Sequence, residues 1–273
     1  MGESPTYALL LAGSGELDVL AATRVLAPAL GLHTTEAARL VVSSHGVPAT
    51  ELDGVRAQRI LMALAAQGVP AALVPTSELV AVPQPHEFCS LNWADAEHLV
   101  SANREGEVRR LLWADIVALC VARVEPPVSR HGSLDQVLPT TPLARLMTKS
   151  IRAWAESESV PNRPGLSREP ETLLSLVSRD AHDHVEHWRA AAERMSYACL
   201  GDRASPHAAT NFHAVVTALH ARLGGAGTNL TERMIAQPNL FPWPVVDHPS
   251  RLDRLLFRLV NLPRPERESR SVR

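Results

Sequence analysis

The sequence has almost no lysine and few aromatic residues. Lys149 is the only lysine among 27 basic residues, and we interpret this bias as the coding preference of a GC-rich bacterial genome. Aromatic residues make up 4% of the 273 residues. The core therefore has to be built from Leu, Val and Ala, and an aromatic-rich platform for carbohydrate or nucleic acid is not expected.

Cysteine is also scarce, and no long apolar run is present. Cys89, Cys120 and Cys199 lie far apart and form no Cys-x-x-Cys pair, which excludes a disulfide framework and a structural zinc site of the usual spacing. No apolar run approaches the ~20 residues of a membrane span, and the first residues lack the positive segment of a signal peptide. We therefore expect a cytoplasmic protein with reduced, buried thiols and no membrane partner.

The charge is balanced. The 27 basic and 29 acidic residues give a formal charge of −2, so the chain has no overall positive field for a polyanion, and no nucleic-acid partner is expected. The densest basic stretch is the charged tail 264–273, which Glu266 and Glu268 interrupt. We interpret this tail as a solvated terminus.

The apolar spacing of residues 6–82 predicts a small α/β module. Compact apolar runs indicate strands, and helical spacing followed by Gly31 or Gly68 indicates helices and their ends. The order strand, helix, helix, strand, helix, strand is typical of a small α/β sandwich, ferredoxin-like or similar, with its helices on one face of an antiparallel sheet. The expected elements are a strand at 7–12, helices at 16–30 and 36–42, a strand at 47–52, a helix at 55–67 and a strand at 71–75.

A family resemblance covers roughly residues 6–75. The segments 30–32, 36–41 and 68–74 resemble the C-terminal domain of the bacterial ribosomal stalk protein, and this resemblance implies a stalk-like fold. In that family, lysines on the first two helices dock translation GTPases. Here the matching positions carry Ala22 and Ala38, so the resemblance implies the fold without that docking surface.

The second predicted domain, 86–263, is a mixed β-rich and helical part that follows a proline-rich boundary at 83–85. Strand-like pieces at 87–93, 97–102 and 108–124 surround a hairpin turn at 103–107. A strand leading into Trp113-Ala114-Asp115-Ile116 resembles small pleckstrin-homology-like barrels of bacterial proteins, so a small antiparallel sheet or barrel is expected. The other expected features are a proline-rich loop at 126–170 that interrupts this domain, a strand near 195–200, and helices at 211–223 and 252–262. The whole chain is thus predicted to be α+β.

A histidine-rich patch is the candidate metal site. In a strand, His182, His184 and Glu186 would share one face, whereas in a helix Asp183 and His187 would be neighbours at i and i+4. Imidazole and carboxylate are zinc ligands, so His182, His184 and His187 are the candidate metal ligands. Because no His-Glu-x-x-His motif or second cluster accompanies them, an exposed polar loop or edge strand is the preferred interpretation.

Other catalytic patterns are incomplete. Residues 11–15, with Gly13 and Gly15, form half of a phosphate loop but lack the third glycine and the Gly-Lys-Ser/Thr sequence. There is no Gly-x-Ser-x-Gly elbow. Cys199 lies in an apolar setting that raises a thiol pKa. We therefore assign no catalytic residue, no cofactor-binding residue and no cofactor.

Three functional hypotheses remain, of which a translation-linked role is the least favoured. The favoured one is a non-catalytic interaction or regulatory module that binds another protein through an exposed sheet or a proline-rich segment. The alternative is a small-ligand or metal-dependent enzyme or sensor, whose site converges from distant histidines, such as 182–187 with His207, His213 or His220. The sequence leaves open whether the chain is an enzyme.

Overall fold

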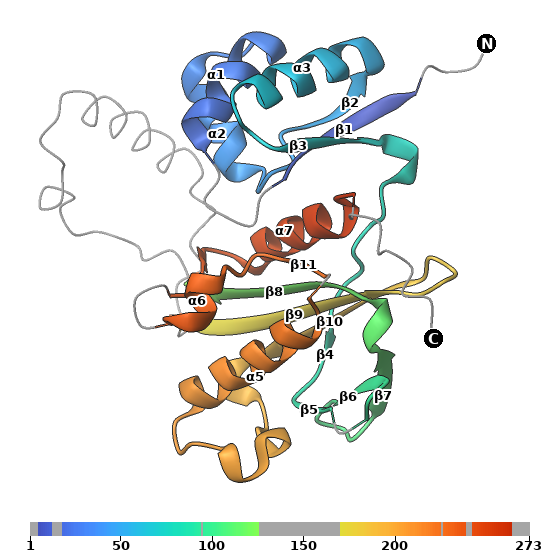
Figure 1. Cartoon of the computed structure of the whole chain (residues 1–273), viewed down its shortest axis with the longest axis vertical. Helices are drawn as coiled ribbons and strands as arrows, with labels where there is room; N and C mark the ends of the chain where they lie inside the picture. The colour runs from blue at the N-terminus through green and yellow to red at the C-terminus, as the bar shows by residue number, and fades with distance from the viewer. Residues whose placement is uncertain are drawn as a thin grey trace, which may run out of the picture. The chain divides into compact units, whose positions relative to one another are not determined.

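The computed structural model describes residues 5–12, 18–93, 95–125, 170–224, 226–238 and 242–263. Its helices and strands are of the α+β class, as the sequence predicts (Figure 1). All of these elements belong to one compact unit, which comprises Met1–Val124 and Glu171–Arg273. The expected loop up to residue 169 and the expected tail 264–273 lie outside the described residues.

The N-terminal residues form a three-stranded antiparallel sheet with three helices on one side (Figure 1). The strand order is β2-β1-β3, with the first strand in the centre. The predicted order of six elements is confirmed. Their bounds are β1 Thr6–Leu11, α1 Val19–Leu30, α2 Thr34–Ser43, β2 Ala49–Asp53, α3 Gly54–Ala66 and β3 Ala71–Pro75.

This arrangement follows from which residues are buried. Leu9 and Leu11 of β1 pack in one cluster with Leu26 of α1 and with Ile60 and Leu64 of α3. The helical spacing of the apolar residues gives each helix one buried face, and that face can only be covered by the sheet.

A larger sheet is built on three long antiparallel strands. These are β8 Ile116–Val124, β9 Glu171–Arg179 and β10 Val185–Ala191, which neighbour one another in that order. Three two-residue strands extend the sheet by parallel pairing: β4 beside β10, and β11 and β12 beside β8. They are β4 His86–Glu87, β11 Gly227–Thr228 and β12 Val245–Val246.

Helices cover both faces of this sheet. Phe212 and Val216 of α5 (Ala208–Arg222) belong to the same buried cluster as Leu174 and Leu176 of β9. The amphipathic helix α7 (Pro249–Asn261) packs on the other face, and Figure 1 shows the two helices on opposite sides of β8 and β9. Both helices were predicted, within a few residues of these bounds. The short helix α6 spans Glu232–Ala236.

A second antiparallel sheet has the order β5-β6-β7. The predicted hairpin turn joins β6 to β7, and Gly106 in it has a φ of 84°, a left-handed conformation that glycine adopts without a steric penalty. Leu99 and Leu111 bury one face of this sheet in the same core as α5. The strands are β5 Ser90–Asn92, β6 His98–Ala102 and β7 Val108–Leu112.

Three local predictions were wrong. The expected strand 87–93 is two short strands, β4 and β5, which belong to different sheets. The expected strand 108–124 is two strands, β7 and β8, which a 3-10 turn at Trp113–Asp115 separates into different sheets. The expected strand at 195–200 is a 3-10 segment, Ala198–Arg203, and the strand lies earlier as β10. β10 pairs with β9 up to Ala191, and in the expected range 195–200 the described chain forms an isolated parallel bridge, Ser196 with Ser90.

Candidate functional site

Two of the predicted metal ligands lie on an exposed turn before β10. The backbone N–H groups of His182 and His184 both donate to Oδ1 of Asp180, at 2.8 and 2.9 Å. These bonds lower the pKa of Asp180, the bond from His184 being the largest cause. The carboxylate is therefore engaged in forming the turn.

The third predicted ligand, His187, is completely buried on β10. Its Nδ1 lies 3.1 Å from the carbonyl oxygen of Pro83, and its Nε2 lies 3.4 Å from the guanidinium of Arg189. Burial, and next the charge of Arg189, lowers the pKa of His187 to about 4. This imidazole is thus held neutral with both ring nitrogens occupied.

Arg189 connects this histidine to α7. Its Nε donates to Oγ of Ser175 at 3.1 Å, and its guanidinium forms an ion pair with Asp253 of α7. The Arg189 side chain thus links the sheet to α7 through polar contacts. It lies on the same face of β10 as His187, because side chains two positions apart along a strand point to the same side.

The structure does not bring the predicted ligands together, because His182 and His184 are exposed whereas His187 is buried. In the described part of the chain, no three His, Cys, Asp or Glu side chains are placed to hold a metal ion. His213, another candidate, stacks on Trp243 with ring centroids 5.7 Å apart, and its Nε2 lies 2.9 Å from the carbonyl oxygen of Ile235.

Two of the cysteines are poor nucleophiles. Burial raises the pKa of Cys120 to about 12 and also raises the pKa of Cys199. The thiolate form that attacks electrophiles is therefore suppressed at both positions. The half phosphate loop lies mostly outside the described residues, because its Gly13, Ser14 and Gly15 are not among them.

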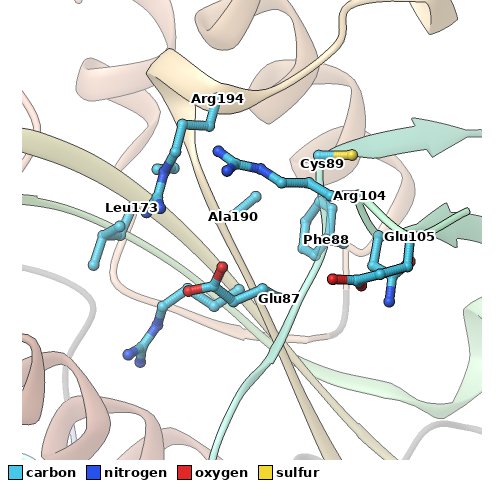
Figure 2. A pocket seen from close by; sticks show the side chains of 11 residues that line it. Glu87, Phe88, Cys89, Arg104, Glu105, Leu173, Ala190 and Arg194 are labelled. Carbon is cyan, nitrogen blue, oxygen red and sulfur yellow. The ribbon is translucent and has the colours of Figure 1, made fainter. Parts of the chain in front are cut away.

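Two small cavities flank Glu87 of β4. The first, of about 100 Å³, lies between β4, the 103–107 hairpin turn and Arg194. Figure 2 shows the Arg104 guanidinium and the Glu87 carboxylate directed toward its middle, whereas the sulfur of Cys89 points away. Arg194 forms an ion pair with Glu171 at 3.6 Å. Cationic and anionic groups thus line this cavity, and the thiol among its lining residues is not aimed into it.

The second cavity, of about 90 Å³, lies where β4 and β10 face β6 and β7. Its lining includes His86 and Trp188, which are opposite each other in the parallel pair and have ring centroids 5.0 Å apart. Ser101, which is buried, and Arg109, which is exposed, are opposite each other in the β6-β7 hairpin and also line this cavity. No sequence pattern indicated this site, because its walls come from separate segments that only strand pairing brings together.

The open edge of β7 lies beside the second cavity, which Arg109 of this strand lines. β7 is the last strand in its sheet, and among the described residues only β6 forms backbone hydrogen bonds with it. Val108 is 60% exposed and Leu112 is 43% exposed, and Arg110 between them is also exposed. Leu111 is buried on the opposite face. A bare edge of this kind can accept an additional strand.

Compared with protein-family models, with curated proteins and with solved structures, the chain matches none. The resemblances to the stalk domain and to pleckstrin-homology-like barrels therefore stay predictions. In the described ranges, no helix is both long enough and apolar enough to cross a bilayer.

Proposed function

We propose that this protein is a non-catalytic interaction module that binds an extended segment of another protein as an additional strand beside β7. The observation that carries the proposal is the open edge of β7, where five consecutive residues have backbone partners on one side only among the described residues. Strand addition satisfies such an edge with main-chain hydrogen bonds, while alternate side chains supply specificity.

The exposed side chains of β7, which form its outward face, determine which residues are favourable in the partner segment. Val108, Arg110 and Leu112 share this face because side chains alternate along a strand, and Val100 lies opposite Arg110 on β6. Side chains directly opposite on adjacent strands interact, and opposite charges there are favourable. The partner segment therefore carries an acidic residue opposite Arg110, with apolar residues two positions before and after it.

The surroundings of β7 favour a protein partner over a polyanion. Arg109 and Arg110 follow a turn that contains Glu105 and Glu107, so the hairpin carries both signs of charge. A nucleic acid or an anionic membrane surface requires a continuous basic patch. Cys89, Cys120 and Cys199 are free thiols, which suits the reducing cytoplasm that we propose as the location.

A designed peptide tests this function directly. The peptide has seven residues, with valine at its second and sixth positions, glutamate at its fourth and threonine elsewhere. Titrating it into the full chain, with 15N-edited NMR as the measurement, is expected to shift the β7 amide signals in a saturable way. Arg110→Glu is expected to weaken binding about fivefold to tenfold, because a favourable cross-strand charge pair becomes repulsive.

The matched control is Arg59→Glu, which makes the same charge change at an exposed position of α3. It should bind the peptide as the unmodified chain does. A peptide with lysine in place of glutamate should bind Arg110→Glu better than it binds the unmodified chain. Equal losses in the two variants, or amide shifts that do not include β7, would contradict strand addition at this edge.

A further inference from the structure

Two buried hydrogen-bonding groups in the wall of the second cavity have no partner. Ser101 is 2% exposed and Trp188 is 4% exposed, and both line this cavity. Neither Ser101 Oγ nor Trp188 Nε1 has a hydrogen-bond partner among the described residues. Buried polar groups in folded proteins are nearly always satisfied, so two orphaned groups in the wall of one cavity point to an occupant.

The indole and a neighbouring arginine indicate what the occupant supplies. The indole N–H of Trp188 is a donor only, so its partner must be an acceptor. Arg109, opposite Ser101 on the neighbouring strand, lines the same cavity and forms no ion pair with a described residue. A guanidinium matches the two oxygens of a carboxylate in a bidentate pair. Trp188, Ser101 and Arg109 together are therefore a set of donors suited to a carboxylate.

Two other residues that line the cavity carry the opposite charge. Glu87 and Glu107 both line it and both are exposed, and Nδ2 of Asn103 donates to Glu107 at 3.0 Å. Two carboxylates in the lining disfavour a simple anion and attract a cationic group. A ligand with a carboxylate at one end and an ammonium at the other would interact favourably with both the donors and the carboxylates that line the cavity.

From this arrangement we infer that the cavity between β4, β10, β6 and β7 binds a free amino acid with a very small side chain, such as glycine or alanine. The carboxylate lies against Arg109, Ser101 and Trp188, and the ammonium lies against Glu87 and Glu107. The cavity measures about 90 Å³, a small volume that suits the smallest amino acids. This site is on the opposite side of β7 from Val108, Arg110 and Leu112.

The indole N–H signal of Trp188 is the direct reporter. The chain has five tryptophans, and a Trp188→Phe variant identifies the signal by its disappearance. Glycine is titrated into the full chain to about 50 mM, far above a Kd of about 1 mM, and acetate, methylammonium and inorganic phosphate are titrated separately. Glycine is expected to shift the Trp188 signal in a saturable way and to bind at least tenfold more tightly than acetate or methylammonium.

Adjacent residues of β7 give the matched variants. Arg109→Gln is expected to weaken glycine binding at least tenfold, whereas Arg110→Gln, which changes the outward face, is expected to alter it less than twofold. An unmoved Trp188 signal, equal binding of acetate and glycine, preferential binding of phosphate, or equal effects of the two variants would each overturn the proposal. Because peptide binding depends on Arg110 and glycine binding on Arg109, failure of one proposal is distinguishable from failure of the other.

Discussion

The side chain of Asn229 forms hydrogen bonds with both backbone polar groups of Val121. Its Oδ1 accepts from the Val121 N–H at 3.0 Å, and its Nδ2 donates to the Val121 carbonyl at 2.7 Å. The amide thus continues the backbone pairing that β11 begins beside β8. Asn261 holds Val80 in the same way, with distances of 2.7 and 2.9 Å. Each of these asparagine side chains thus forms the pair of hydrogen bonds that the backbone of a neighbouring strand would otherwise form.

Replacing this amide is expected to destabilise the fold. Asn229→Ala leaves the N–H and the carbonyl of Val121 buried without partners, and each such group costs about 1–3 kcal/mol. We expect a loss of about 2–4 kcal/mol in the free energy of unfolding, measured by urea titration. Gln58→Ala, at an exposed position of α3, is the control and should change stability by less than about 0.5 kcal/mol. A loss below 1 kcal/mol for Asn229→Ala would contradict the pairing.

The buried neutral His187 makes stability depend on pH. Its pKa is about 4 in the folded chain, below the ordinary value of 6.5. Between these values the unfolded chain binds a proton that the folded chain does not, so the free energy of unfolding falls as the pH is lowered from 6.5 to 4. The slope attributable to this residue approaches ~1.4 kcal/mol per pH unit, for a total of about 3 kcal/mol.

His187→Gln provides the comparison, because glutamine remains neutral throughout this range. Urea unfolding at several pH values between 7.5 and 4.5 is expected to show a shallower pH dependence for the variant than for the unmodified chain. Parallel curves for the two proteins would show that His187 takes up its proton equally in both states. An NMR titration of the imidazole gives the folded-state pKa independently.

Glu51 occupies a strained backbone position in β2. Its φ is 61°, and it lies where the β1-β2 register shifts between Tyr7 and Leu9. The register shift marks a β-bulge, and glycine is the residue that is favoured at the left-handed position of such a bulge. Glu51→Gly is expected to stabilise the chain by about 0.5–1 kcal/mol, or to raise Tm by a few degrees. A lower Tm would mean that the carboxylate makes a compensating interaction.

The sequence predicted those features that depend on neighbouring residues. Gly31 and Gly68 indicated where helices end, and both have a φ of 70°. The hairpin turn at 103–107 was found from its composition. The boundary between β7 and β8 was missed because apolar residues continue through Trp113, and only the pairing with different partners separates the two strands.

The candidate sites could not be predicted, because their parts are distant in the sequence. The histidine patch was predicted as a metal site because its members are adjacent in the sequence. In the structure, His187 lies on the face of β10 that is directed toward α7, whereas His182 lies in the turn before this strand. Ser101 and Trp188 become neighbours of one cavity only through the pairing of β4 with β10 and the packing of the hairpin. Local patterns carry no information about such contacts.

Hydrogen exchange at β7 tests the central claim, that this edge accepts a strand, most directly. Amide exchange in Val108–Leu112 is measured by NMR with and without saturating valine-glutamate-valine peptide, and β3, another edge strand, serves as the internal reference. We predict that exchange of the outward-facing β7 amides slows at least about tenfold, because new main-chain hydrogen bonds protect them, while β3 is unchanged. Unchanged exchange in β7, or equal protection of β3, would contradict the account.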